Sequence, residues 1–119
     1  MPGREADVRI RDAGDRIDPS GNGTWEGREL GRRATLVQFS SAFCQPCRAT
    51  RRVLAEVAAI VPGVSHMEID AEAELDLVRE LDILKTPTVL VLDAEGRTVL
   101  RATGQPRKAD VIAALGRAV

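Results

Sequence analysis

The hydrophobic and polar positions of this chain alternate between strand and helix patterns from residue 34 onward. Residues 34–40, "ATLVQFS", form a short apolar run with β-branched residues, which predicts a central strand. Between Pro46 and Val61 the apolar residues fall on one helical stripe, and a Pro-Gly pair ends that pattern. Residues 64–70, "VSHMEID", alternate as a second strand. These patterns predict a strand–helix–strand unit.

The C-terminal half predicts a short helix, a hairpin and a last helix. The expected inner face of the short helix consists of Leu75, Val78 and Leu81. Residues 86–104 predict two strands joined by a turn from Asp93 to Gly96, where the glycine can supply a positive φ. Pro106 suits the first position of the last helix. The expected inner face of that helix consists of Val111, Ile112, Leu115 and Ala118.

The predicted order of elements is β-α-β-α-β-β-α. A strand–helix–strand unit forms a right-handed crossover between parallel strands, whereas the strands of a hairpin are antiparallel. We therefore expect an α/β domain whose central mixed four-stranded sheet is flanked by three main helices.

The first part of the chain has a different character. Residues 1–33 are rich in Gly, Arg and Asp, which predicts a loosely ordered N-terminal arm that packs partly on the domain of residues 34–119. Val8 and Ile10 alternate with arginines, a pattern that indicates a short strand. Trp25 is the residue best able to anchor the arm by hydrophobic packing, and a substrate-facing role is the alternative.

Composition and charge narrow the range of partners. With 17 Lys and Arg against 18 Asp and Glu, the net charge of −1 gives no reason to expect nucleic acid or an anionic membrane as partner. No apolar run approaches the roughly 20 residues of a membrane span, and the N-terminus lacks the apolar stretch of a secretory signal. We expect a cytoplasmic monomer without membrane insertion. A membrane-tethered or extracytoplasmic location stays open if a native leader or anchor is missing from this sequence.

The chemistry is concentrated in "FCQPCR", which holds both cysteines of the chain, Cys44 and Cys47. Cys44 stands where the first strand ends, so the start of the following helix favours its thiolate. Cys47 is expected to be more internal. Cys44 would then attack a substrate disulfide and Cys47 would resolve the mixed disulfide. Pro46 stiffens this turn at little cost, because the N–H that it lacks would go unused there.

Two other uses of the cysteine pair remain open at this point, a zinc or copper site and a purely structural pair of thiols. Zinc is usually held by four ligands, and two cysteines supply only half of them. The only histidine is His66, so a metal site would need acidic ligands or a second chain. We favour electron exchange, for which the pair itself is the redox group and neither a metal nor another cofactor is expected.

Four separated pieces of sequence resemble the thioredoxin family: "LVQFSSAFCQPCR", "EID", "TPTVLVLDAEGR" and "ATG" before a terminal helix. The resemblance implies a thioredoxin fold and a thiol–disulfide oxidoreductase, with protein disulfides as substrates and a reductase or membrane donor as electron source. It also implies a cis bond between Thr86 and Pro87 that faces the cysteines, where the Thr86 backbone can pair with a substrate strand. Gly104 resembles the small residue beside the active-site surface, or is a plain strand-ending turn.

The sequence departs from the family below the cysteines. Gln38 stands where thioredoxins usually carry a buried acid, and an amide cannot serve as that base. His66 aligns with a lysine of the family and could move a proton to or from Cys47. The alternative is a half-exposed strand residue without a role.

The sequence also departs from the family around the pair. Ser40 and Phe43 replace the usual aromatics of the lead-in, which makes the rim smaller and more polar. Gln45 replaces the usual glycine and is expected to tune the redox potential. Arg48 either stabilises the thiolate, meets acidic substrates or is a solvated helix residue. Because Gln38 replaces the acid, a non-enzymatic binding module or redox sensor that uses the cis-proline surface is the alternative function.

Overall fold

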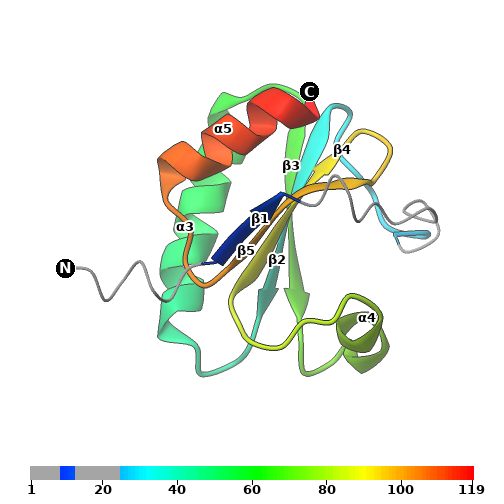
Figure 1. The fold of residues 1–119 in the computed structure, drawn as a ribbon, viewed down its shortest axis with the longest axis vertical. Coiled ribbons are helices and arrows are strands. Elements are labelled where there is room, and N and C mark those ends of the chain that lie inside the picture. The colour runs from blue at the N-terminus through cyan, green and yellow to red at the C-terminus, as the bar shows by residue number, and fades with distance from the viewer. Residues whose placement is uncertain (1–8, 13–24) are drawn as a thin grey trace.

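The structure is a computed structural model that describes residues 9–12 and 25–119. In this part of the chain, helices cover both faces of a sheet with strand order β1-β5-β4-β2-β3 (Figure 1). The strands are β1 (Arg9–Asp12), β2 (Ala34–Ser40), β3 (Val64–Asp70), β4 (Thr88–Asp93) and β5 (Thr98–Thr103). The helices are α3 (Gln45–Ile60), α4 (Leu75–Glu80) and α5 (Lys108–Ala118).

The strand pairing confirms the predicted mixed sheet. Strands β2 and β3 are parallel and are joined through α3, while β4 is antiparallel to both β2 and β5. The sheet has one strand more than the four predicted, because β1 pairs antiparallel with β5 and sets Arg9 opposite Thr103. This strand includes Ile10, where the alternating pattern indicated one, whereas Val8 lies outside the described residues.

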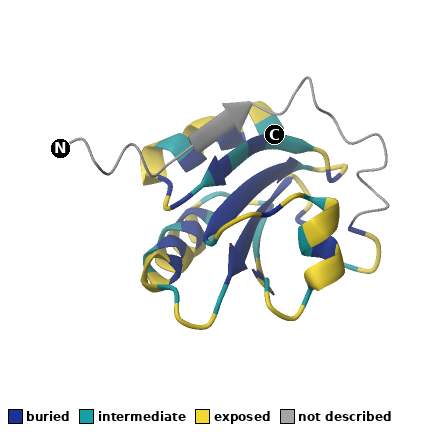
Figure 2. Cartoon of the chain, turned by 60° about the horizontal axis from the view of Figure 1, so that its bottom comes forward, coloured by how far each residue is buried: buried dark blue, intermediate teal, exposed yellow. Residues whose placement is uncertain are grey.

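The two faces of the sheet bury different sides of β2. Ala34 and Leu36 pack in one core cluster with residues of α3 and α5. Val37 and Phe39 point the other way and pack in a second cluster with residues of α4. In Figure 2 the central strands are largely buried, whereas the helices that cover them are exposed on the sides that face away from the sheet. Gln38 belongs to the α3 side of the sheet, because side chains two apart in a strand share a face.

Trp25 anchors the part of the N-terminal arm that precedes β2. Its side chain is 3% exposed and belongs to the core cluster on the α4 side. It therefore packs in the core, as the first interpretation predicted, and does not face a substrate. The remainder of the predicted arm, residues 1–8 and 13–24, lies outside the described residues, and the boundary at residue 33 stays a prediction.

The inner faces of two helices differ from the prediction. In α4, Leu77 is buried whereas Leu75 is 54% exposed. In α5, Ala114 is buried whereas Ile112 is 43% exposed. The predicted faces included residues that lie about 100° around each helix from the true contact line, since each residue advances by that angle. The last helix also begins at Lys108, two residues after Pro106.

The hairpin turn forms as predicted. Gly96 has a φ of +87°, and its N–H donates to the Asp93 carbonyl at 3.0 Å. The Asp93 carboxylate accepts hydrogen bonds from the N–H groups of Glu95 and Arg97 at 3.0 and 2.9 Å. The turn is therefore held by both the backbone and the side chain of its first residue.

Candidate active site

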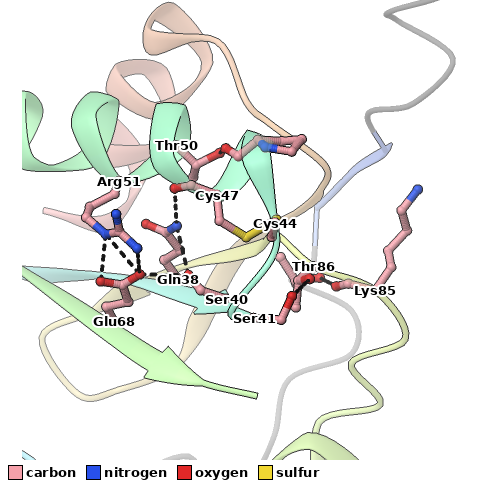
Figure 3. Close-up of a disulfide and its surroundings, with 12 residues drawn as sticks. Gln38, Ser40, Ser41, Cys44, Cys47, Thr50, Arg51, Glu68, Lys85 and Thr86 are labelled. Carbon is pink, nitrogen blue, oxygen red and sulfur yellow. Dashed lines mark hydrogen bonds and ion pairs between the residues drawn. A yellow bond between two sulfur atoms is a disulfide. The ribbon is translucent and has the colours of Figure 1, made fainter. Parts of the chain in front are cut away.

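The two cysteines form a disulfide at the start of α3, with their Cα atoms 5.2 Å apart (Figure 3). Cys44 is the N-cap residue of the helix, and the Cys47 N–H donates to its carbonyl at 3.2 Å. Cys47 is 1% exposed, whereas Cys44 is partly exposed. Of the two cysteines, only Cys44 is exposed enough to react with a large molecule.

The first turn of α3 leaves its positive end directed at the sulfur atoms. No side chain caps the helix, and no acidic residue lies in its first turn. Pro46 lies in this turn, where its missing N–H costs nothing, and its carbonyl accepts a hydrogen bond from Thr50 Oγ1 at 2.8 Å. The helix dipole favours a thiolate at this position.

The loop before β4 lies beside the disulfide. The Thr86–Pro87 peptide is cis, as the resemblance implied. Ser41 and Thr86 join this loop to the segment before Cys44 through a hydrogen bond between their hydroxyls at 2.9 Å (Figure 3). Sequence reasoning missed Ser41, because a hydroxyl in a loop carries no pattern that identifies its partner.

Gly104 lies against the same loop. Its N–H donates to the Pro87 carbonyl at 2.8 Å, and its φ of +100° lies in the region that favours glycine. It is buried at the end of β5. Gly104 therefore connects the end of β5 to the cis proline. The two interpretations of this residue, a place beside the active-site surface and a turn that ends the strand, do not exclude each other.

Gln38 lies directly beneath Cys47 and is fully buried. Its Nε2 donates to the carbonyl oxygen of Cys47 at 2.8 Å and to Ser40 Oγ at 3.0 Å. The orientation of the amide is fixed because a carbonyl oxygen only accepts, so the amide nitrogen must face it. The side chain at the position where the resemblance implies an acid thus contacts the backbone of Cys47.

His66 reaches the other end of the same amide. Its Nε2 lies 3.4 Å from Gln38 Oε1, although the strand register pairs His66 with Leu36. Gln38 therefore lies between the imidazole and the Cys47 backbone. Transfer of a proton between His66 and Cys47 stays a prediction. Because Gln38 lies between them, such a transfer would require its amide to move or a water molecule to bridge the two residues.

A carboxylate that sequence reasoning missed completes the polar group. Glu68 stands opposite Gln38 in the parallel register of β2 and β3. Its Oε2 accepts a hydrogen bond from Ser40 Oγ at 2.9 Å, and Arg51 binds it at 2.6 Å. The only signal in the sequence was positional, because pairing the two strands brings residues 38 and 68 together on one face.

The electrostatics of this group favour a neutral imidazole and an ionised carboxylate. Burial lowers the pKa of His66, partly opposed by the negative charge of Glu68. The hydrogen bonds from Arg51 lower the pKa of Glu68, with a smaller contribution from Ser40. The ion pair in turn raises the pKa of Arg51. At neutral pH the group therefore holds one ion pair and a neutral histidine.

The buried position of His66 predicts a loss of stability in mild acid. Because the folded protein binds a proton on His66 less readily than the unfolded chain, the free energy of unfolding should fall as pH drops below the ordinary pKa of 6.5. We expect His66→Gln to remove this part of the loss. Urea titrations between about pH 7.5 and about pH 5.5 would measure it, since Glu68, with an ordinary pKa of 4.5, stays mostly ionised there in both states.

The same variant tests the predicted proton transfer. If His66 exchanges a proton with Cys47, His66→Gln should change the pH profile of disulfide reduction. An identical profile would reject that role, and equal acid losses of stability in both proteins would contradict the burial argument.

The rim of the site carries apolar and cationic side chains. Phe43 is 98% exposed next to Cys44, and Gln45 and Arg48 are also exposed. Leu84 is a large exposed hydrophobic residue two positions before Thr86. Sequence reasoning had included Leu84 in no site, because a leucine next to another apolar residue, here Ile83, is normally expected to pack inward.

We searched the described residues for groups of metal ligands and for helices that could span a membrane. In residues 9–12 and 25–119, no group of three or more His, Cys, Asp or Glu side chains could hold a metal ion. Within the same ranges, none of the helices has both the length and the apolar character needed to cross a bilayer.

Comparison with known proteins agrees with this geometry. Thioredoxin H4-1 from Oryza sativa subsp. japonica is 31% identical over 84 residues, covering 70% of this chain and 64% of that protein. Thioredoxin from Mycolicibacterium smegmatis is 29% identical over 90 residues, covering 73% and 80%. The crystal structure of thioredoxin NaTrxh from Nicotiana alata superposes with a TM-score of 0.66 at 22% identity, covering 83% and 81%.

The extent of these matches differs between relatives. The chain spans 64%, 58% and 44% of the length of three curated plant thioredoxins. A family model described as "Thioredoxin-like domain" matches residues 26–118, which is most of the chain and includes both cysteines and the cis proline. By its sequence and by its fold, the chain belongs to the thioredoxin-like domain family.

Proposed function

We propose that this protein is a thiol–disulfide oxidoreductase that reduces or exchanges disulfide bonds of other proteins through Cys44 and Cys47. The observation that carries the proposal is the asymmetry of the pair: a partly exposed cysteine caps α3, and a buried one follows in the first turn. A nucleophile must be reached by its substrate, whereas a resolving thiol needs to reach only its neighbour.

The proposed reaction moves two electrons from the protein to its substrate. The Cys44 thiolate attacks one sulfur of the substrate disulfide, forms a mixed disulfide and releases the other sulfur as a thiolate. Cys47, once deprotonated, attacks Cys44 and releases the second substrate thiolate. The protein is left with the Cys44–Cys47 disulfide, and the two released thiolates take up protons from solvent.

Substrates and electron donors follow from the same proposal. An extended substrate segment would pair with the Thr86 backbone beside the cis proline, with Phe43 and Gly104 at the rim. A reductase or a membrane donor would restore the dithiol. We propose a reducing, cytoplasmic setting for this cycle, and a membrane-tethered or extracytoplasmic protein would require a donor on that side.

Insulin reduction tests the proposal. In the presence of dithiothreitol, the protein should accelerate the precipitation of insulin chains. Protein whose reduced thiols have been alkylated should give no acceleration over dithiothreitol alone.

The alternative function rests on Gln38, which replaces the acid that usually assists the resolving thiol. A binding module or sensor would keep the cis-proline surface and would not turn over. Untreated protein with no more effect on insulin than the alkylated sample would favour that alternative and reject a general disulfide reductase.

A further inference from the structure

Five groups are linked in sequence by hydrogen bonds between α3 and the sheet, beneath the disulfide in Figure 3. We call this set the polar ring, and it consists of the Cys47 carbonyl and the side chains of Gln38, Ser40, Glu68 and Arg51. Gln38 binds the Cys47 carbonyl and Ser40, Ser40 binds Glu68, and Glu68 binds Arg51. The distances along the ring are 2.8, 3.0, 2.9 and 2.6 Å.

Each hydrogen bond of the ring has a fixed direction. The Cys47 carbonyl only accepts, so both N–H groups of Gln38 are used, one for it and one for Ser40. The single hydroxyl proton of Ser40 is then directed to the Glu68 carboxylate. Because the Ser40 hydroxyl has one proton and donates it to the carboxylate, loss of the carboxylate would free that hydroxyl and weaken its hold on Gln38.

The ring begins and ends on the same helix. Cys47 and Arg51 are four residues apart in α3, and in a regular α-helix the carbonyl of the first pairs with the N–H of the second. Gln38 and Ser40 come from β2 and Glu68 comes from β3. The ring therefore ties the first turns of α3 to two parallel strands, independently of the disulfide.

The ring is anchored by an ion pair that does not titrate near neutral pH. Arg51 binds Glu68 through Nε at 2.8 Å as well as through its terminal nitrogen, and these hydrogen bonds lower the pKa of the carboxyl. His66, the other titratable group that faces it, has a lowered pKa and is neutral. The Glu68 carboxylate therefore stays charged and hydrogen-bonded at neutral pH, and the contribution that we infer for the ring is positional.

We propose that Glu68 is a positioning residue for the resolving cysteine: through Ser40 and Gln38 it holds the backbone of Cys47 in place while Cys44 is bound to substrate. The inference deepens the proposed function and rests on it. In the mixed disulfide the bond between the two cysteines is absent, so it no longer fixes their separation. The ring persists in that state and keeps Cys47 near its target, which speeds an intramolecular attack.

An aromatic disulfide separates the attack step from the resolution step. Reduced protein mixed with an equimolar amount of dithiobis(nitrobenzoate) should release one nitrothiobenzoate when Cys44 attacks. It should release the second when Cys47 attacks Cys44 and forms the intramolecular disulfide. Stopped-flow absorbance records the two releases as two phases. In Glu68→Ala the second phase should slow about fivefold, the size expected for one lost hydrogen bond, while the first phase stays within about twofold.

Two further variants make the result specific. Ser40→Ala cuts the ring at another bond and should slow the second phase similarly, and Ser40→Ala combined with Glu68→Ala should be no slower than either alone. The matched control is Glu56→Ala, which removes another exposed glutamate paired across α3, at 3.5 Å from Lys108, and should leave both phases unchanged.

The outcomes distinguish the two levels of inference. Equal rates in the wild type and Glu68→Ala, equal slowing of both phases, or slowing by Glu56→Ala to the same degree would overturn the positioning role. Absence of the first phase in the wild type would instead overturn the proposed function, on which the role depends.

Discussion

Replacing Cys47 with serine should leave a protein that attacks disulfides but cannot release them. Cys44 caps α3 and is partly exposed, so the mixed disulfide still forms, whereas the buried group that resolves it is lost. Without added thiols, Cys47→Ser should accumulate a covalent complex with a disulfide substrate. Turnover with a regenerating reductant other than a small thiol should fall at least about a hundredfold, as is usual when a covalent participant is removed.

The complex can be measured on a non-reducing gel, where it should disappear after dithiothreitol is added. The matched variant is Cys44→Ser, which keeps the buried thiol and should neither turn over nor accumulate the complex. If Cys44→Ser trapped substrate and Cys47→Ser did not, the two roles would be reversed. Trapping by both variants would mean that the buried cysteine is accessible in solution.

The architecture could be predicted from the sequence because its elements follow local patterns. The apolar runs of β2 and β4 and the alternation of β3 identify strands, and the Asp93–Gly96 turn identifies the hairpin. The inner faces of α4 and α5 were less predictable, since several apolar residues compete for one contact line. Leu75 and Ile112 have the right character but lie beside that line, and only the packing of the sheet decides between them.

The cysteine pair was predictable for the same reason, because two thiols one turn apart form a local motif. The support beneath it was not, because it depends on strand register. Residues 38 and 68 are 30 positions apart, and only parallel pairing of β2 with β3 sets Glu68 opposite Gln38. Arg51 then approaches from α3. Sequence reasoning identified Gln38 and His66 by alignment with the family, but it gave no role to Glu68, the first residue of the "EID" stretch.

The replacement of a buried acid by Gln38 has a physical reason within this structure. The side chain faces the Cys47 carbonyl, which can only accept a hydrogen bond, so an ionised carboxylate would set two acceptors against each other. The negative charge is instead carried by Glu68, where Arg51 pairs it and solvent reaches it. The neutral donor beneath Cys47 is therefore Gln38, and the negative charge lies on Glu68, which is linked to Gln38 through Ser40.

Restoring an acid tests that reasoning, and Gln38→Asp should destabilise the protein as pH rises. Full burial and the nearby Glu68 charge should raise the pKa of the introduced carboxyl above its ordinary value of about 3.9. The folded state then binds the proton more tightly than the unfolded chain, so stability is greatest in acid. The free energy of unfolding should fall as pH rises from about 4 through the folded pKa.

Gln38→Asn is the control, because asparagine has the same length as aspartate and carries no charge. At about pH 4 the two variants should be similar, and at neutral pH the aspartate variant should be about 3 kcal/mol less stable, as measured by urea titration of the oxidised proteins. A constant difference across the pH range would show that the introduced carboxylate finds a partner or water. Residue 38 could then be an acid, and the repulsion between a carboxylate and the Cys47 carbonyl would no longer explain why this position holds glutamine.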